Sequence, residues 1–184
     1  MINRTEALAL IRDTAPDHLV IHALETEAVM RRLAARLNHD AEVWGLAGLL
    51  HDLDYPQTKD TPEKHGLITA ETLSGKLPAE ALTAIKRHNE MNGNQPETLF
   101  DFALRCGETV TGLIHTAALV RPTRMQGMEA KSLKKKMKDK AFAASVCRET
   151  IKECEKLGLE LGEFLTLSIE AITGIESEVG LAAT

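Results

Sequence analysis

Residues 43–50 read VWGLAGLL, an apolar run that is followed directly by His51 and Asp52. A helix built from this run is buried on most sides, so its carboxyl end places two polar side chains inside the protein. Buried polar and charged groups need hydrogen-bond partners or a metal ion. Histidine and aspartate are both ligands of divalent cations. The pair therefore predicts a helical protein with a metal site at the end of this helix.

The composition favours helices along the whole chain of 184 residues. Hydrophobic residues make up 43% and charged residues 27%, which is typical of a soluble globular domain, and the commonest residue types are good helix formers. The sequence shows no strand alternation, internal repeat or linker. We therefore expect one all-α domain over residues 1–184, a bundle of about seven to nine helices. Its metal-site core spans about 18–120, and C-terminal helices within about 129–176 pack on this core.

Capping residues and prolines set the expected helix limits. Asp17 is expected to cap a helix that runs to about Leu37, and Asp40 to cap the helix that ends at His51 and Asp52. Thr61 before Pro62 predicts the start of the next helix. The full set of expected helices is 4–13, 17–37, 40–52, 61–75, 78 to beyond 88, 97–120, a short basic helix after 129, 139–157 and 161–175.

Charge and targeting signals are weak. The net charge of −5 gives no indication of nucleic-acid affinity, and no apolar stretch reaches the roughly 18 residues of a membrane span. The polar start MINRTEALALIRDT is unlike a signal peptide. Three cysteines without a CxxC pair indicate reduced thiols, and Cys147 and Cys154 are expected to be buried on one helix face. We expect a cytoplasmic protein without a nucleic-acid polymer or membrane partner, and a homodimer is possible.

Two further histidines and a glutamate fall on inward helix faces. His22 shares a stripe with Leu19 and Leu33, and His88 shares one with Ile85. A lone histidine of this kind is more often a hydrogen-bonded core residue than a ligand, but the pair His51-Asp52 favours ligation. Glu108 lies in the middle of an apolar stripe, where a carboxylate is costly unless it is paired or bound to a metal. The alternative for Glu108 is a buried ion pair with a lysine or arginine.

These residues form a mixed set of nitrogen and oxygen donors. Such a set suits Fe, Mn, Ni, Co or Zn better than Ca or Mg. One ion requires His22, His51, Asp52 and Glu108. A second ion is possible if Asp52 bridges and His65 and His88 contribute. One or two ions would activate a water molecule and bind a phosphate, without a serine or cysteine nucleophile.

With these residues in place, the chain resembles the HD superfamily of metal-dependent phosphohydrolases. The resemblance rests on His22, on the pair His51-Asp52 and on the position of Glu108, and it spans at least residues 18–120. The stretches GLAGLLHDLDY, KHGLITAETL, AIKRHNE, TGLI and KSLKKKMKDKAFAAS are similar to small stand-alone members of the family.

The resemblance implies an HD-domain helical bundle in which His22, His51 and Asp52 bind metal and His65 and His88 serve a second ion. It also implies hydrolysis of a phosphomonoester or phosphoanhydride in a nucleotide or similar small molecule by a metal-activated water. The family normally has Asp where this chain has Glu108. That difference supports an alternative, an inactive metal- or nucleotide-binding regulatory domain. A purely structural helical bundle is a third possibility.

Several other polar residues have both a functional and an ordinary interpretation. Asp54 is expected to act with His51 and Asp52 in catalysis by orienting a ligand or water, or else to form a turn. Thr111 is a candidate to contact a metal ligand or the substrate. Lys134 and Lys135 are candidate substrate-binding residues, because the lysine-rich run that contains them can attract an anion, and Arg121 is a candidate that adds to this charge; a solvated helix face is the alternative.

Overall fold

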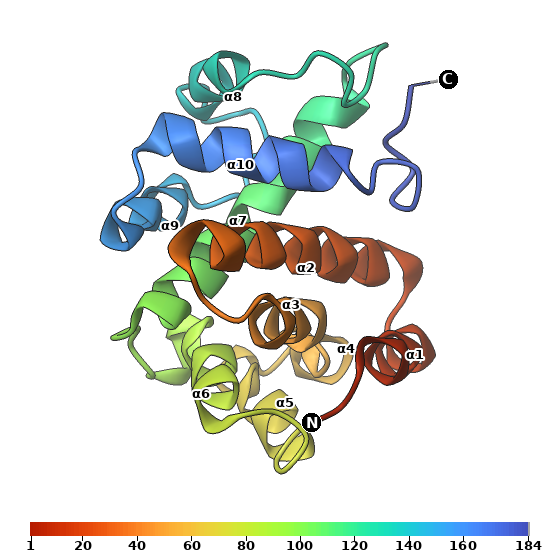
Figure 1. Cartoon of the computed structure of the whole chain (residues 1–184), viewed down its shortest axis with the longest axis vertical. Helices are drawn as coiled ribbons and strands as arrows, with labels where there is room; N and C mark the ends of the chain where they lie inside the picture. Colours follow the sequence, from red (N-terminus) through yellow and green to blue (C-terminus); the bar gives the residue numbers. More distant parts are fainter. Residues whose placement is uncertain (184) are drawn as a thin grey trace.

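Helices account for all the regular secondary structure in residues 1–183, the part of the chain that the computed structural model describes (Figure 1). Nine α-helices have five or more residues, and α4 is a single turn. The all-α fold is therefore confirmed. The α-helices are α1 (Arg4–Thr14), α2 (Asp17–Leu37), α3 (Ala41–Leu50), α4 (Tyr55–Thr58), α5 (Leu67–Thr72), α6 (Ala79–Arg87), α7 (Leu99–Leu119), α8 (Ala130–Met137), α9 (Arg148–Lys152) and α10 (Leu161–Thr173), with 3-10 helices η1 (Pro62–Lys64), η2 (Glu90–Asn92) and η3 (Glu153–Leu157).

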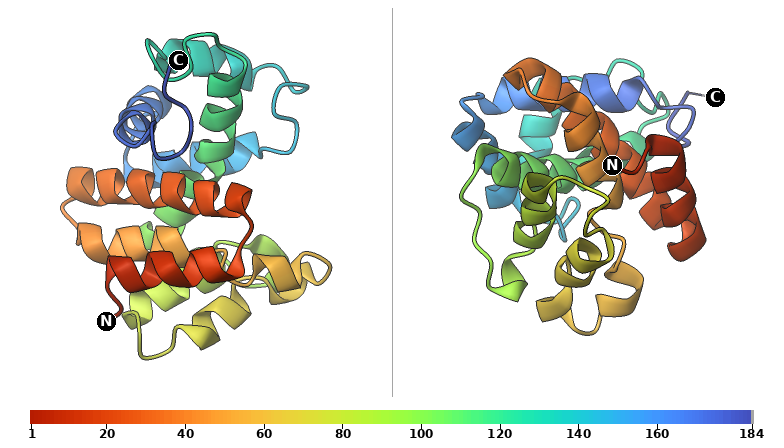
Figure 2. Two further views of the ribbon diagram at one scale, coloured as in Figure 1. Left: turned by 90° about the vertical axis from the view of Figure 1, so that its right-hand side faces the viewer. Right: turned by 60° about the horizontal axis from the view of Figure 1, so that its bottom comes forward.

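The long helix α2 lies at the centre of the structure. It packs against α3 and α7, and α10 packs on the side of α2 that faces away from α3 (Figure 1). The left view of Figure 2 shows α1, α2 and α3 stacked next to one another. Helix α8 packs on α10, whereas α9 and η3 pack on α7. The C-terminal helices therefore contact the same two long helices that supply part of the predicted metal site.

Small residues let α2 approach its neighbours closely. A Cβ atom added to Gly48 of α3 would lie 3.0 Å from the carbonyl oxygen of Thr26 in α2, and one added to Gly107 of α7 would lie 3.1 Å from Sδ of Met30. Leu46, Leu49 and Leu50 are fully buried at these contacts. Burial of each such side chain contributes about 1.5–3 kcal/mol. The apolar run of α3 is thus the core element that its sequence predicts.

Helix starts agree with the sequence at some positions and differ at others. Asp40 caps α3 as predicted, accepting hydrogen bonds from the backbone of Glu42 and Val43. The predicted cap at Asp17 is wrong, because Pro16 occupies the N-cap position without a side-chain hydrogen bond. Asp101 near the start of α7 has no exposed surface: it forms the capping box of α7 and an ion pair with Arg87 at 3.0 Å.

The expected helix over 61–75 is divided. The 3-10 helix η1 ends before His65, which has an extended backbone, and Gly66 has a φ of 84° before α5 begins at Leu67. Added to Gly66, a Cβ atom would lie 2.7 Å from the carbonyl oxygen of Ile85. The helix is therefore interrupted where Gly66 lies in close contact with α6. This interruption changes the direction in which the side chain of His65 points.

The expected single helix over 139–157 is wrong for its first half. Residues 139–147 form turns and bends, and only α9 and η3 are helical. The guanidinium group of Arg148 donates hydrogen bonds to backbone carbonyls of this segment, which removes those acceptors from a helix. Cys147 is exposed and Cys154 is buried, so the expected pair of buried thiols is also wrong.

No helix of residues 1–183 is long and apolar enough to cross a membrane.

Candidate metal centre

The carboxyl end of α3 places His51 and Asp52 inside the protein, as their sequence predicts. The side chain of His51 is 1% exposed and that of Asp52 is 11% exposed. The Nδ1 atom of His51 lies 2.8 Å from the carbonyl oxygen of Gly48. A carbonyl oxygen only accepts, so Nδ1 carries the proton and Nε2 is left with a free lone pair.

His88 repeats this arrangement at the end of α6. Its Nδ1 atom lies 2.6 Å from the carbonyl oxygen of Ile85, three residues earlier, just as His51 bonds to Gly48. Its side chain is 5% exposed. The backbone of a helix end therefore fixes both the ring orientation and the tautomer, and Nε2 of His88 is again the free nitrogen.

His22 on α2 is held by a side chain of α7. Its Nδ1 atom lies 3.0 Å from Oγ1 of Thr111, and the Thr111 hydroxyl lies 2.7 Å from the carbonyl oxygen of Glu108. The hydroxyl donates to that carbonyl, so it accepts from Nδ1 of His22. Thr111 is fully buried behind the histidine, where it contacts a predicted metal ligand.

His65 is held by Asp54. The Nδ1 atom of His65 lies 2.8 Å from Oδ1 of Asp54, whose Oδ2 accepts hydrogen bonds from the backbone of Gly66 and Thr69, both at 2.9 Å. The Asp54 side chain is 1% exposed. A carboxylate behind a histidine fixes the ring and raises its basicity as a ligand. Asp54 thus has the orienting position that was one of its two sequence interpretations.

All four histidines therefore point Nε2 toward Asp52. Oδ1 of Asp52 lies 3.3 Å from Nε2 of His51, 3.2 Å from that of His65 and 3.4 Å from that of His88, and Oδ2 lies 3.6 Å from Nε2 of His22. The Nε2 atoms of His22 and His51 are 3.2 Å apart, and those of His65 and His88 are 3.0 Å apart. The helices α2, α3 and α6 and the segment between η1 and α5 bring these groups together.

Two overlapping groups of donors have a geometry suited to a metal ion. The ligand atoms of His22, His51 and Glu108 lie within 4.8 Å of one another, and so do those of His51, Asp52 and His88. Four imidazoles whose Nε2 atoms point into the cluster, together with two carboxylates, match the donor types that divalent transition metals prefer. The residues present therefore fit such an ion. Glu108, in place of the usual Asp, does reach the site, and Thr109 donates a hydrogen bond to it.

Burial and neighbouring charges shift the pKa values of this cluster. Burial lowers the pKa of His51 to about 3, so its ring is neutral. Burial alone would raise the pKa of Asp52, but His51, His65 and His88 outweigh it and hold that pKa well below its usual value. Hydrogen bonds to Asp52 and Asp54 overcome burial and raise the pKa of His65 to about 9. Burial raises the pKa of Glu108 to about 8.

A cavity of about 380 Å³, which we call the metal cavity, opens onto these ligands. His22, Asp52, His65, His88 and Glu108 line its floor. Its remaining walls come from residues outside the predicted site, which lie on α7, in short helices and in the loops between them: Tyr55, Asn89, Glu90, Met91, Arg105, Thr109, Gly112, Ser145, Val146, Cys147 and Thr150.

The basic residues predicted to bind substrate lie elsewhere. Lys134 lines a different cavity, Lys135 is exposed on α8, and neither lines the metal cavity. The guanidinium group of Arg121 donates to the carbonyl oxygens of Arg124 and Gln126 within its own turn. The role of these three residues in substrate binding stays a prediction. The cation on the metal cavity is instead Arg105, which bonds both oxygens of Glu153 at 2.8 Å.

Fold and site together define an α-helical domain with a buried cluster of histidines and carboxylates suited to divalent metal ions. Comparison with protein-family models gives the family: the HD domain model matches residues 19–144. The chain belongs to the HD-domain family, whose members are generally metal-dependent phosphohydrolases. The matched range contains all six predicted metal ligands. No match was found among curated proteins or among solved structures.

Proposed function

We propose that this protein hydrolyses a phosphomonoester or phosphoanhydride bond in a nucleotide or a similar small molecule, and that it uses a divalent transition metal. The observation that carries the proposal is the convergence of four Nε2 atoms on Asp52, with each ring held from behind through Nδ1. Rings that are all held through Nδ1, with Nε2 left free, are typical of metal-ligating histidines rather than of histidines in a hydrophobic core.

The ligands proposed for the metal are His22, His51, Asp52, His65, His88 and Glu108. Two donor groups that share His51 support either one ion or two. When bound, a divalent ion of this kind lowers the pKa of a water molecule and withdraws charge from a phosphoryl oxygen. The chain itself keeps the ring of His51 neutral. Thr111 fixes the orientation of His22, and Asp54 fixes that of His65.

The walls of the metal cavity suit a small substrate. Its volume of about 380 Å³ lies in the range of small-molecule sites. Arg105 is the one cation among its walls, and its charge is balanced by Glu153. Hydroxyl groups of Tyr55, Ser145 and Thr150 are available to hydrogen-bond the parts of the substrate away from the metal. We also propose a cytoplasmic location, which the three free cysteines support.

One observation favours a second candidate, a regulatory domain that binds metal or nucleotide without turnover. The longer side chain of Glu108 stands where the family normally has Asp, and it reaches only one of the two donor groups. A ligand that is one methylene longer changes where an ion can sit. The two candidates differ in turnover, and only the hydrolase requires the metal ion.

The test measures metal per chain by elemental analysis and phosphate release from nucleoside and sugar phosphates. Asp52→Ala removes the carboxylate at the centre of the cluster, and Asp60→Ala makes the same change at an exposed position as the control. We expect one or two equivalents of metal and measurable turnover in the wild type and the control, and neither in Asp52→Ala. Metal without turnover supports the regulatory domain. Absence of metal after addition of Fe, Mn, Ni, Co or Zn refutes the hydrolase and leaves a regulatory domain that binds nucleotide.

A further inference from the structure

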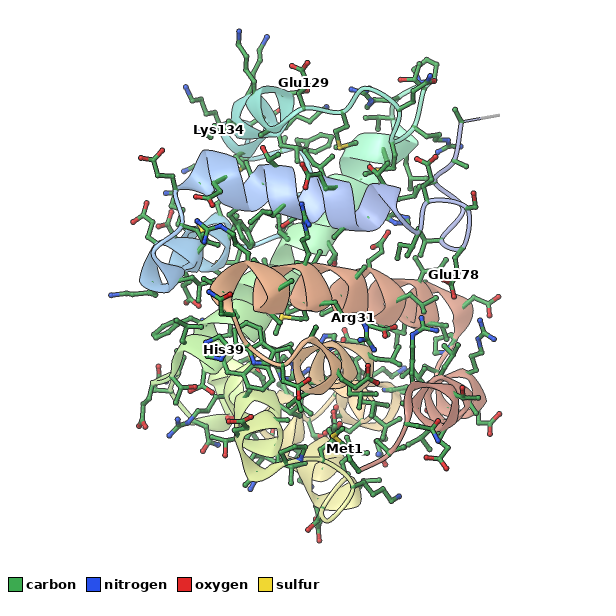
Figure 3. All side chains as sticks on the ribbon, viewed as in Figure 1. Met1, Arg31, His39, Glu129, Lys134 and Glu178 are labelled. Atoms are coloured by element: carbon green, nitrogen blue, oxygen red, sulfur yellow. The ribbon has the colours of Figure 1, made fainter. Side chains whose placement is uncertain are left out.

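A second and larger cavity, of about 830 Å³, is lined by residues of α8, of α9 and of the start of α10. Figure 1 shows where these three helices lie. Lys134, labelled in Figure 3, is on its α8 side. Five cationic side chains and a single carboxylate, Glu149, line this cavity. The cationic residues are Lys134, Lys138, Lys140, Arg148 and Lys152. We call it the basic cavity.

Most of this positive charge has no ion-pair partner among residues 1–183. Lys152 pairs with Glu149 at 2.8 Å. Lys134, Lys138 and Lys140 form no ion pair with any carboxylate of residues 1–183, although the chain as a whole carries a net charge of −5. Like charges gathered around a concave surface repel one another, and an anion bound there relieves the repulsion.

Arg148 holds the wall of the basic cavity in place. Its guanidinium group donates to the carbonyl oxygens of Ala143 and Val146, each at 2.6 Å, of Asp139 at 3.2 Å, and of Phe142. These acceptors carry no net charge, so the positive charge of Arg148 is not neutralised. Its buried Nε atom has no hydrogen-bond partner among the described residues.

Residues 144–148, which we call the dividing segment, separate the two cavities. Ala144, Val146 and Arg148 line the basic cavity, and Ser145, Val146 and Cys147 line the metal cavity. Neighbouring residues therefore face opposite sides of one thin wall. Any ligand that moves or orders this wall from the basic side also acts on the metal cavity.

The dividing segment also touches the helix that carries Glu108. A Cβ atom added to Gly112 of α7 would lie 3.1 Å from Cγ2 of Val146. Gly112 follows Glu108 by about one helical turn and itself lines the metal cavity. The absence of a side chain at Gly112 lets Val146 pack directly on α7, so a displacement of Val146 changes the space beside the metal ligands.

We propose that the basic cavity binds a small molecule with two or more phosphate groups, and that this binding orders the dividing segment and alters the metal cavity. The volume is that of a nucleotide-sized site, and Met137 and Leu161 offer apolar contacts for an uncharged part of the ligand. The concave shape and the negative net charge of the chain favour a small anion over a nucleic-acid polymer. The binding stands independently of the proposed hydrolase function, whereas its effect on turnover rests on that function.

The binding test is calorimetric titration of the full chain with inorganic tripolyphosphate, without added metal. We expect one molecule bound per chain in the wild type and also in Asp52→Ala. The variant Lys138→Gln/Lys140→Gln should bind at least about tenfold more weakly. The control Lys131→Gln/Lys135→Gln removes the same charge from exposed positions of α8 outside the cavity and should stay within about twofold of the wild type.

Two results overturn the binding proposal. Equal weakening in both double variants would mean a diffuse attraction to lysines, and loss of binding in Asp52→Ala would place the anion at the metal cluster. Because Asp52→Ala is expected to lack metal and turnover, retained tripolyphosphate binding in that variant separates this proposal from the hydrolase proposal.

The coupling test uses the rate at which Cys147 reacts with a thiol reagent. Cys147 is exposed on the dividing segment, whereas Cys106 and Cys154 are buried, so labelling of the folded protein reports on Cys147. Saturating tripolyphosphate should slow this labelling by about threefold or more in the wild type and leave it unchanged in Lys138→Gln/Lys140→Gln. An unchanged or faster rate in the wild type overturns the coupling.

Discussion

Oδ1 of Asp54 lies 2.8 Å from Nδ1 of His65, while Nε2 of the same ring lies 3.2 Å from Oδ1 of Asp52. One imidazole thus connects a carboxylate in the metal cluster to one behind it. Asp54 is itself held by the backbone of Gly66 and Thr69. The turn before α5 therefore determines where His65 can present its free nitrogen.

Replacing Asp54 by Asn should weaken metal binding by about 10–100-fold, because a neutral amide no longer raises the basicity of His65. Metal affinity measured by competition with a chelator checks this, and Asp60→Asn is the exposed control. Unchanged affinity in Asp54→Asn would mean that His65 is not a metal ligand.

Thr111→Val should leave the shape of the α2–α7 contact intact but remove the acceptor for Nδ1 of His22. The ring then loses its fixed tautomer, and we expect metal affinity to fall about tenfold. The matched control is Thr83→Val, which removes a hydroxyl bonded to the carbonyl oxygen of Ala79 on an exposed helix face. If both variants bind metal equally well, Thr111 has no positioning role.

Substitutions of Glu108 separate the effect of charge from that of length. Glu108→Gln removes a charged ligand and should lower both metal affinity and turnover by about tenfold or more. Glu108→Asp restores the residue usual in the family and should keep the metal content of the wild type. Higher turnover in Glu108→Asp than in the wild type would show that the glutamate limits the reaction, whereas full activity in Glu108→Gln would exclude ligation by this residue.

Gly48→Ala should destabilise the protein by about 1–3 kcal/mol, since the new Cβ would meet the backbone of α2 at Thr26. Gly45→Ala is the control in the same helix, because the atoms nearest to its Cβ belong to the side chain of Arg31 and not to the backbone of α2. The free energy of unfolding in urea measures both. A larger loss for Gly45→Ala would contradict a backbone contact at Gly48.

His115 and Glu25 form a pair whose effect on stability depends on pH. Nδ1 of His115 lies 2.7 Å from Oε1 of Glu25, and this hydrogen bond raises the pKa of His115 despite partial burial. A raised pKa in the folded state stabilises the protein fully below the unfolded value of about 6.5, and this stabilisation is lost as the pH rises through the folded pKa.

His115→Gln should therefore cost about 1 kcal/mol at acid pH and progressively less as the pH rises. Unfolding free energies of the wild type and the variant across this range give the difference as a function of pH. The exposed His18→Gln is the control. A difference that does not change with pH would show that His115 is not charged in the folded protein.

The sequence predicts the helical parts of the site better than the parts in loops. His22, His88 and Glu108 lie on inward stripes of regular helices, and a period of 3.6 residues is enough to place them. The bond from Asp54 to His65 depends on the break at Gly66, which arises from close contact with α6. Contacts of that kind join distant segments and leave no periodic signal.

Contacts that leave no periodic signal also explain why the predicted helix over residues 139–147 is wrong. Its residues are good helix formers, but the single side chain of Arg148 takes up four of its backbone carbonyls. An aspartate near a helix start is usually exposed, but Asp101 is buried in an ion pair with Arg87 of another helix. Local propensity is outweighed in both cases by one arginine.

The four histidines differ in what holds them, and this difference bears on how the site can change over evolutionary time. His51 and His88 donate hydrogen bonds to backbone carbonyl oxygens of Gly48 and Ile85. Replacing either of these two residues by another amino acid does not remove its carbonyl oxygen. His22 and His65 instead donate hydrogen bonds to the side chains of Thr111 and Asp54, and a single base change can replace either of these residues. Half of the cluster is thus robust to mutation, and the other half is where selection can adjust its preference among metals.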